Sequence, residues 1–314
     1  MASSGVAPPY GVIWKFLKSG KVIPFLGAGA SFVGRPRDSN WNAAKPEFLP
    51  SGLELAHFLA GQANFPAADE RDRDDLAKVS SYYADIAGRG ILRETLRDVF
   101  SHEFHCGSVH EFLASVPAHL FIVVTNYDTL VEQAFRAAGK PYDLLIHPAD
   151  RKDIASAVLW WPHGAASPLV KSPNELDLDL TKTTVIYKMH GTVFQETDEW
   201  DNFVITEEDY VEFLSRMTTN TAVPALFYQH ARDRSFLFLG YSLRDWNLRV
   251  VLKNLTRNFA VRGGVNGDRD GEVLSWAIQK NPSELERRLW AKRDVNIFDV
   301  ALDEFVRNMR ELVS

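Results

Sequence analysis

Apolar residues along this chain gather in short, continuous runs that end in glycine or polar residues. Such runs, rich in branched and aromatic side chains, are typical of buried strands. The first run, VIPFL, is followed at once by GAGAS, which predicts a strand that enters a tight turn. The predicted strands lie at or within residues 22–26, 121–130, 142–146, 185–191, 203–205, 236–248, 272–278 and 295–298.

Between the strands, apolar residues recur at intervals of three and four positions, which predicts amphipathic helices. Ser51 is a suitable N-cap for one helix, and Thr206, followed by acidic residues, for another. The helical period runs through the whole of residues 69–116, and the other helices are expected at 10–17, 53–63, 222–232, 283–292 and 303–313. Because strands alternate with helices, we expect an α/β fold with a mainly parallel sheet covered by helices on both faces.

The elements predict a single domain over residues 1–314. Residues 52–118 are expected as a helical insertion or small module, and residues 150–182 as an excursion between strands. Two polar segments, 33–50 and 261–271, are candidate gating or contact regions, and a surface loop without a role is the alternative for both.

Composition narrows the class of protein. The length and the 46% of hydrophobic residues allow a sizeable core, and no apolar run approaches the length of a membrane span. The N-terminus lacks the pattern of a signal peptide, so we expect a soluble, cytoplasmic protein. A single cysteine, Cys106, excludes an internal disulfide and a four-cysteine zinc site. The net charge of −6 argues against strong direct nucleic-acid binding.

The candidate chemistry lies at four strand ends: GAGAS at 27–31, TNYD at 125–128, KMHG at 188–191 and GYS at 240–242. The carboxyl ends of parallel strands share one edge of a sheet, so these residues can converge on one ligand. Each motif alone has a plain alternative: a glycine turn without a ligand, a helix cap at Asp128, or a structural histidine at His190. Their common position in the topology favours a nucleotide site.

The ordered set GAGAS, TNYD, KMHG and LGYS resembles the sirtuin-like domain family, most closely its bacterial branch of NAD-consuming anti-phage defence domains. The resemblance spans roughly residues 22–312. It implies a Rossmann-type sheet with a smaller helical module and NAD bound between them. It also implies roles for a set of residues along that edge: Ala28 and Gly29, with Gly27 and Ser31, toward the pyrophosphate; Asn126 and Asp128, beside Thr125, toward the nicotinamide ribose and carboxamide; His190 toward the ribose hydroxyls; Gly240 and Ser242 toward a phosphate or the adenosine ribose.

From this resemblance we expect an NAD+ glycohydrolase that forms nicotinamide and ADP-ribose and depletes NAD+ during phage infection. Asn126 and His190 are the expected catalytic residues: the amide can hold water, and imidazole, with a pKa near neutrality, can act as a general base. NAD is then a substrate, and no metal is expected. The single cysteine, and Thr125 in place of the glutamine usual before the asparagine, separate this chain from the zinc-containing protein deacylases.

Two alternatives stay open. One is an NAD-dependent protein deacylase or ADP-ribosyltransferase without zinc, and the other is a non-catalytic subunit that binds NAD or ADP-ribose. The chain ends with the last expected helix of the nucleotide fold, so control of an NADase is expected from elsewhere. The resemblance implies self-assembly into a homo-oligomer, or a partner such as a HerA-type ATPase or a short Argonaute-like protein.

Overall fold

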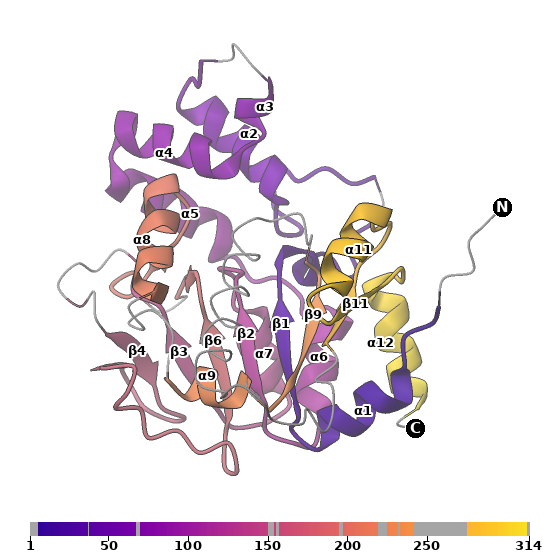
Figure 1. Cartoon of the computed structure of the whole chain (residues 1–314). Helices are drawn as coiled ribbons and strands as arrows, with labels where there is room; N and C mark the ends of the chain where they lie inside the picture. Colours follow the sequence, from indigo (N-terminus) through magenta and orange to yellow (C-terminus); the bar gives the residue numbers. More distant parts are fainter. Residues whose placement is uncertain are drawn as a thin grey trace.

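A sheet of nine strands forms the centre of the part of the chain that the structure, a computed structural model, describes (Figure 1). The described residues are 6–36, 38–66, 70–149, 154, 157–194, 197–218, 225–231, 233–241 and 275–312. Ser242 and the segment 261–271, both named above, lie outside these residues. No helix within the described ranges has the length and apolar character needed to cross a membrane.

The strand order in the sheet is β11-β10-β9-β1-β2-β6-β3-β4-β5. The strands are β1 (Val22–Leu26), β2 (Phe121–Val124), β3 (Tyr142–Ile146), β4 (Val158–Trp161), β5 (Leu169–Lys171), β6 (Thr184–Lys188), β9 (Ser235–Leu239), β10 (Ser275–Ile278) and β11 (Val295–Phe298). Pairing is parallel from β11 through β3 and antiparallel only at β3–β4 and β4–β5. A separate hairpin joins β7 (Gly191–Thr192) to β8 (Asn202–Phe203).

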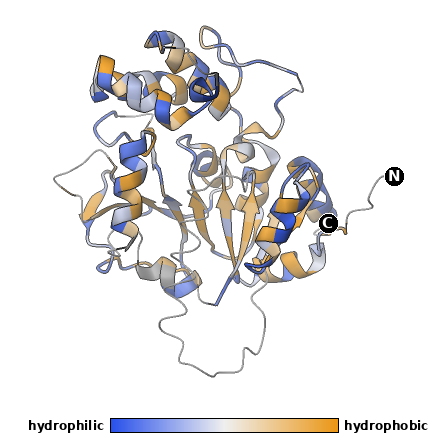
Figure 2. Ribbon diagram, turned by 45° about the horizontal axis from the view of Figure 1, so that its top comes forward, coloured by the Kyte–Doolittle hydropathy of each residue, from blue (hydrophilic) through white to orange (hydrophobic). Residues whose placement is uncertain are grey.

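Helices cover both faces of this sheet, as the sequence predicts. One face packs against α1 (Tyr10–Lys18), α6 (Ser108–Ser115), α7 (Leu130–Ala137) and α12 (Leu302–Glu311). The other packs against α8 (Glu207–Thr218), α9 (Ala225–Ala231) and α11 (Glu284–Ala291). The central strands are hydrophobic along their length, whereas the covering helices carry both characters (Figure 2). The predicted α/β class with a mainly parallel, Rossmann-type sheet is therefore confirmed.

A second group of helices lies beyond the carboxyl ends of the strands and has its own core (Figure 1). Its members are α2 (Gly52–Gln62), α3 (Glu70–Arg73), α4 (Leu76–Ala87) and α5 (Arg89–Phe100). Ser51 caps α2, as the sequence predicts, and the structure adds a capping box with Glu54. The Tyr127 ring, in the turn after β2, lies 5.3 Å from that of Phe100 and 5.2 Å from that of Phe203. The helical group is thus packed onto the edge of the sheet where the candidate residues lie.

Strands β4 and β5 were not predicted. They lie within residues 150–182, where prolines and acidic residues obscure any period, and they add antiparallel strands to the edge of the sheet. Leu169 and Val170 of β5 are both 45% exposed, so the strand has no continuous buried face to mark it in the sequence. The excursion between β3 and β6 therefore extends the sheet.

Candidate functional site

The order of the strands places a crevice beside β1. The chain moves from β1 to β2 on one side and later returns to β9 on the other, and ligands of open α/β sheets bind at such a reversal. Val124, the last residue of β2, pairs with Lys188, the last residue of β6. Asn126 and His190 thus follow neighbouring strand ends, as expected from the sequence.

The glycine turn after β1 is packed against the end of β9. The N–H of Gly27 donates to Leu239 O at 3.0 Å, and the N–H of Gly29 to Gly240 O at 2.8 Å. A Cβ atom on Gly29 would lie 2.8 Å from Gly240 O, so the glycine permits this close approach. The N–H groups of Gly27 and Gly29, two residues expected near the pyrophosphate, are therefore used within the protein. Ala28, between them, is exposed, and its role toward a pyrophosphate stays a prediction.

Three of the candidate side chains form one hydrogen-bonded chain. Asn126 Nδ2 donates to Gly27 O at 3.0 Å and to Ser31 Oγ at 2.8 Å, and Ser31 Oγ donates to Asp128 Oδ2 at 2.7 Å. Asp128 Oδ1 also accepts from the N–H of Leu130, the first residue of α7, whereas the N-cap of that helix is Thr129 and not Asp128. The loops after β1 and β2 are held together by this chain, in which Asp128 only accepts.

Tyr241 joins the ends of β9 and β2 and was not selected from the sequence. Its hydroxyl lies 2.5 Å from Thr125 Oγ1, which also donates to Leu26 O at 3.2 Å. The Tyr241 ring packs edge-on against Phe25 at 5.3 Å. Its place between Gly240 and Ser242, both selected, was the only signal in the sequence. Tyr241 therefore lines the candidate site next to Thr125.

His190 is buried against α8 on the neighbouring strand end. Its ring lies edge-on to those of Tyr210 and Phe213, each 5.6 Å away. Burial lowers the pKa of His190 to about 4, because the charged imidazolium loses its hydration there. The sequence-based expectation of a pKa near neutrality is therefore wrong, and His190 is a neutral imidazole throughout the physiological range.

A cavity of about 600 Å³ opens on another part of the sheet, between α7 and the β3–β4 edge. Aromatic side chains including Phe135, Trp161 and Phe194 line it. None of the described candidate residues does, so this cavity is separate from the candidate site. Elsewhere in the described ranges, no cluster of three or more His, Cys, Asp or Glu side chains could hold a metal ion.

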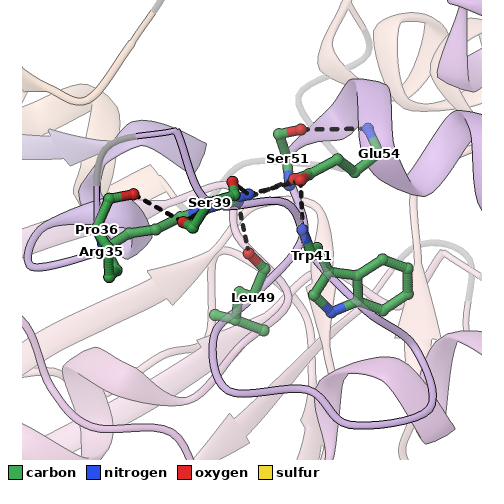
Figure 3. Close-up of polar contacts among 7 residues, drawn as sticks. All are labelled: Arg35, Pro36, Ser39, Trp41, Leu49, Ser51 and Glu54. Atoms are coloured by element: carbon green, nitrogen blue, oxygen red, sulfur yellow. Dashed lines mark hydrogen bonds and ion pairs between the residues drawn. The ribbon is translucent and has the colours of Figure 1, made fainter.

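The segment 33–50 is held to α2 by an ion pair (Figure 3). Arg35 binds Glu54 through both terminal nitrogens, at 2.5 and 2.9 Å, and also donates to Leu49 O and Ser39 O. Glu54 further accepts from the N–H of Trp41 at 2.7 Å. Hydrogen bonds from Arg35 are the main reason that the pKa of Glu54 falls to about 2. The candidate gating segment is therefore an ordered loop tied to the helical group.

Replacing Glu54 with glutamine is expected to lower the free energy of unfolding by about 2 kcal/mol, since charged hydrogen bonds are lost. Because the folded pKa of Glu54 is depressed, its contribution is present above pH 4.5 and is lost as the pH falls toward 2. Urea unfolding at pH 7 and pH 3 measures both effects. Glu47→Gln, an exposed glutamate of the same segment, is the matched control and should change little. Equal stability of the two variants would contradict the role of the ion pair.

Known proteins resemble this chain over most of its length. NAD(+) hydrolase ThsA of Enterococcus faecium is 30% identical over 249 residues, which cover 76% of this chain and 41% of that protein. Defense-associated sirtuin 2 of Bacillus subtilis is 22% identical over 288 residues, 90% of this chain and 23% of that protein. The chain thus spans about two fifths or less of the length of these curated relatives. A crystal structure of a SIR2 homolog–NAD complex aligns with 99% of this chain and 98% of its own at 14% identity and a TM-score of 0.35.

The model of the SIR2-like domain family matches residues 121–298. This range begins with β2 and ends with β11, and it includes the strand ends that carry Asn126, His190 and Gly240. The match covers more than half of the chain, so this protein belongs to the SIR2-like domain family, as its motifs predict.

Proposed function

We propose that this chain is an NAD+ glycohydrolase that cleaves NAD+ to nicotinamide and ADP-ribose and acts as an NAD-depleting effector in prokaryotic anti-phage defence. The observation that carries the proposal is the Asn126–Ser31–Asp128 chain of hydrogen bonds at the strand reversal beside β1. Relatives named NAD(+) hydrolase ThsA and Defense-associated sirtuin 2 support the reaction and the setting.

Asn126 has the geometry to hold the attacking water. Its amide nitrogen faces Gly27 O, which can only accept, and Ser31 Oγ, so both N–H bonds are used and the orientation of the amide is determined. The amide oxygen, Oδ1, is the atom left to accept a hydrogen bond from water. A water held there can attack the anomeric carbon as the bond to nicotinamide breaks and its electron pair returns to the pyridine ring. The proton of the water leaves to a base or to solvent.

His190 is the proposed base toward this water or a ribose hydroxyl. A neutral imidazole can accept a proton, and burial keeps it neutral at pH 7. The low pKa makes it a weaker base than free imidazole, which suits a transition state with oxocarbenium character, in which departure of nicotinamide leads and proton transfer follows. The remaining proposed contacts to NAD+ are made by a set along the same edge: Gly27, Ala28, Gly29, Ser31, Thr125, Asp128, Gly240 and Ser242.

Incubation of the purified chain with NAD+, with nicotinamide and ADP-ribose measured by chromatography, tests the proposal. Release of both products in equal amounts is expected, alone or with the proteins encoded beside it, since the chain spans only part of its relatives. Transfer of an acyl group from an acyl-lysine peptide would instead indicate a deacylase. Calorimetric binding of NAD+ without turnover under all these conditions would identify a binding subunit.

Control of the activity is proposed to come from self-assembly or from a partner such as a HerA-type ATPase or a short Argonaute-like protein. A cytoplasmic location is proposed with it, because NAD+ is the substrate and Cys106 is a free thiol. Light scattering of the chain alone and with its genomic neighbours distinguishes a homo-oligomer from a mixed assembly.

The pH profile should reflect the low pKa of His190. We expect kcat/KM for nicotinamide release to show no protonation step of His190 between pH 8 and pH 5, because the imidazole protonates only near pH 4. Stability should fall by about 3 kcal/mol from pH 6.5 to pH 4, since the unfolded histidine gains a proton that the folded one cannot hold. Turnover and urea unfolding across this range measure the two effects. A kinetic pKa near 6.5 that disappears in His190→Gln but not in the exposed control His105→Gln would contradict the assignment.

A further inference from the structure

A lysine lies fully buried behind the candidate site. Lys188 ends β6, its side chain is 0% exposed, and its ammonium donates to the backbone carbonyl of Asp128. Oε1 of Glu132, in the first turn of α7, lies 3.5 Å from the Lys188 ammonium and is its counter-charge. The Glu132 side chain is only 4% exposed, so the whole ion pair is removed from water.

This ion pair is poorly explained as a source of stability. Removing two charges from water costs several kcal/mol per ion, and a well-packed apolar pair is often as stable or more so. Neither carboxylate oxygen of Glu132 has a hydrogen-bond partner within the described part of the chain, and burial raises the pKa of Glu132. The Lys188 ammonium also sits near the N-terminus of α7, where the helix dipole disfavours a cation. A functional reason for the pair is therefore needed.

The functional reason is found in the residue that the Lys188 ammonium binds, Asp128. Asp128 is held at three atoms: its carbonyl by Lys188, its Oδ1 by the N–H of Leu130 at 3.1 Å, and its Oδ2 by Ser31 Oγ at 2.7 Å. Of the three bonds, only the one from Lys188 holds the carbonyl of Asp128, and hence the orientation of the peptide plane after it. Ser31 in turn accepts from Asn126. A shift of Asp128 would therefore also shift the Asn126 amide, which is proposed to hold water.

We infer that Lys188, paired with Glu132, is a positioning residue that fixes the turn from Asn126 to Asp128 in its reactive geometry. This role rests on the proposed function. It acts through Asp128 and Ser31 and requires no contact between Lys188 and NAD+. Lys188 should consequently affect the chemical step more than the binding of substrate.

The test compares two variants. Lys188→Met leaves Glu132 buried without its counter-charge and should destabilise the protein. Lys188→Met/Glu132→Leu removes both charges and should recover the stability of the wild type in urea unfolding. Its kcat for nicotinamide release should remain about 10-fold or more below that of the wild type, with KM for NAD+ changed less than about 3-fold. The exposed pair Lys182 and Asp179, replaced as Lys182→Met/Asp179→Leu, is the matched control and should leave kcat unchanged.

Wild-type turnover by a double variant of recovered stability would overturn the inference, because the pair would then be dispensable for the reaction. If the double variant does not fold, Glu132→Gln keeps the side-chain volume and removes the carboxylate that lies beside the Lys188 ammonium. It should lower kcat about 5-fold or more at constant KM, and equal turnover would overturn the inference. A wild type that binds but never cleaves NAD+ would refute the proposed function instead. In that case, the role of Lys188 is tested by hydrogen exchange of the Leu130 amide. Exchange should be about 10-fold faster in the variant that lacks Lys188 than in the wild type, and an unchanged rate would refute the role.

Discussion

Asn126→Ala should reduce the rate of nicotinamide release by about 100-fold or more while the protein stays folded. The substitution removes Oδ1, the atom proposed to orient the attacking water, together with two donated hydrogen bonds. His190→Ala should have an effect of the same order, since it removes the proposed base. Single-turnover assays with the enzyme in excess over NAD+ measure the chemical step, and circular dichroism with urea unfolding reports whether each variant is folded.

The two lost bonds are also structural, so a control for stability is required. Ser31→Ala removes one of the partners of Asn126 but leaves its bond to Gly27 O and its free amide oxygen. This variant should lose about 10-fold in rate, clearly less than Asn126→Ala. Asn42→Ala, at an exposed position in the loop before α2, should behave as the wild type. Near-full turnover by folded Asn126→Ala and His190→Ala would contradict the assignment of both residues.

A large structural effect is expected from Gly240→Ala. Gly240 has φ +71°, and a Cβ atom there would lie 2.1 Å from the backbone nitrogen of Ala30 and 2.5 Å from the carbonyl carbon of Gly29. Both neighbours are backbone atoms of the glycine turn, which cannot move without breaking the bond between Gly29 N and Gly240 O. We expect a loss of about 3 kcal/mol or more in unfolding free energy and loss of NAD+ binding.

Gly139→Ala is the matched control for this prediction. Gly139 has a similar φ of +62°, but nothing lies within 4 Å of a Cβ atom placed there. It should therefore show only the cost of the left-handed backbone, about 1 kcal/mol. Urea unfolding and calorimetric titration with NAD+ distinguish the two. If Gly240→Ala lost no more stability than Gly139→Ala, the close packing of the two loops would not be what requires glycine.

The local sequence pattern was sufficient to predict most of the helices and strands. The strands β1, β2, β3, β6 and β9 are short apolar runs that end in glycine or polar residues, and the capping residues Ser51 and Thr206 precede helices as predicted. The helical stretch 69–116 was correct in type, but it divides into four helices, of which α6 packs against the sheet. The divisions depend on which helix faces which core, and a continuous period does not reveal that.

The sequence predicted where the candidate site lies in the fold better than it predicted the contacts that its residues make. The four strand ends and the family followed from the motifs, whereas the pKa of His190 depends on Tyr210 and Phe213, which come from another element. The reason for the glycine at position 29 is the backbone of Gly240, far along the chain. Likewise, nothing near Lys188 in the sequence indicates that its ammonium reaches the carbonyl of Asp128.

By itself, the sequence determined the class of fold, the family and the edge of the sheet at which the candidate residues gather. The family follows from the resemblance of the four ordered motifs. The fold class and the edge follow from periodicity and from the rule that parallel strands present their carboxyl ends together, both of which act along or between whole elements. The tertiary structure alone decided which atoms are already bonded, which groups are buried, and hence which remain for a ligand. Hydrogen bonding and desolvation act over a few ångströms between residues distant in sequence, so the engaged glycine N–H groups, the neutral His190 and the buried Lys188 became evident only once the chain was folded.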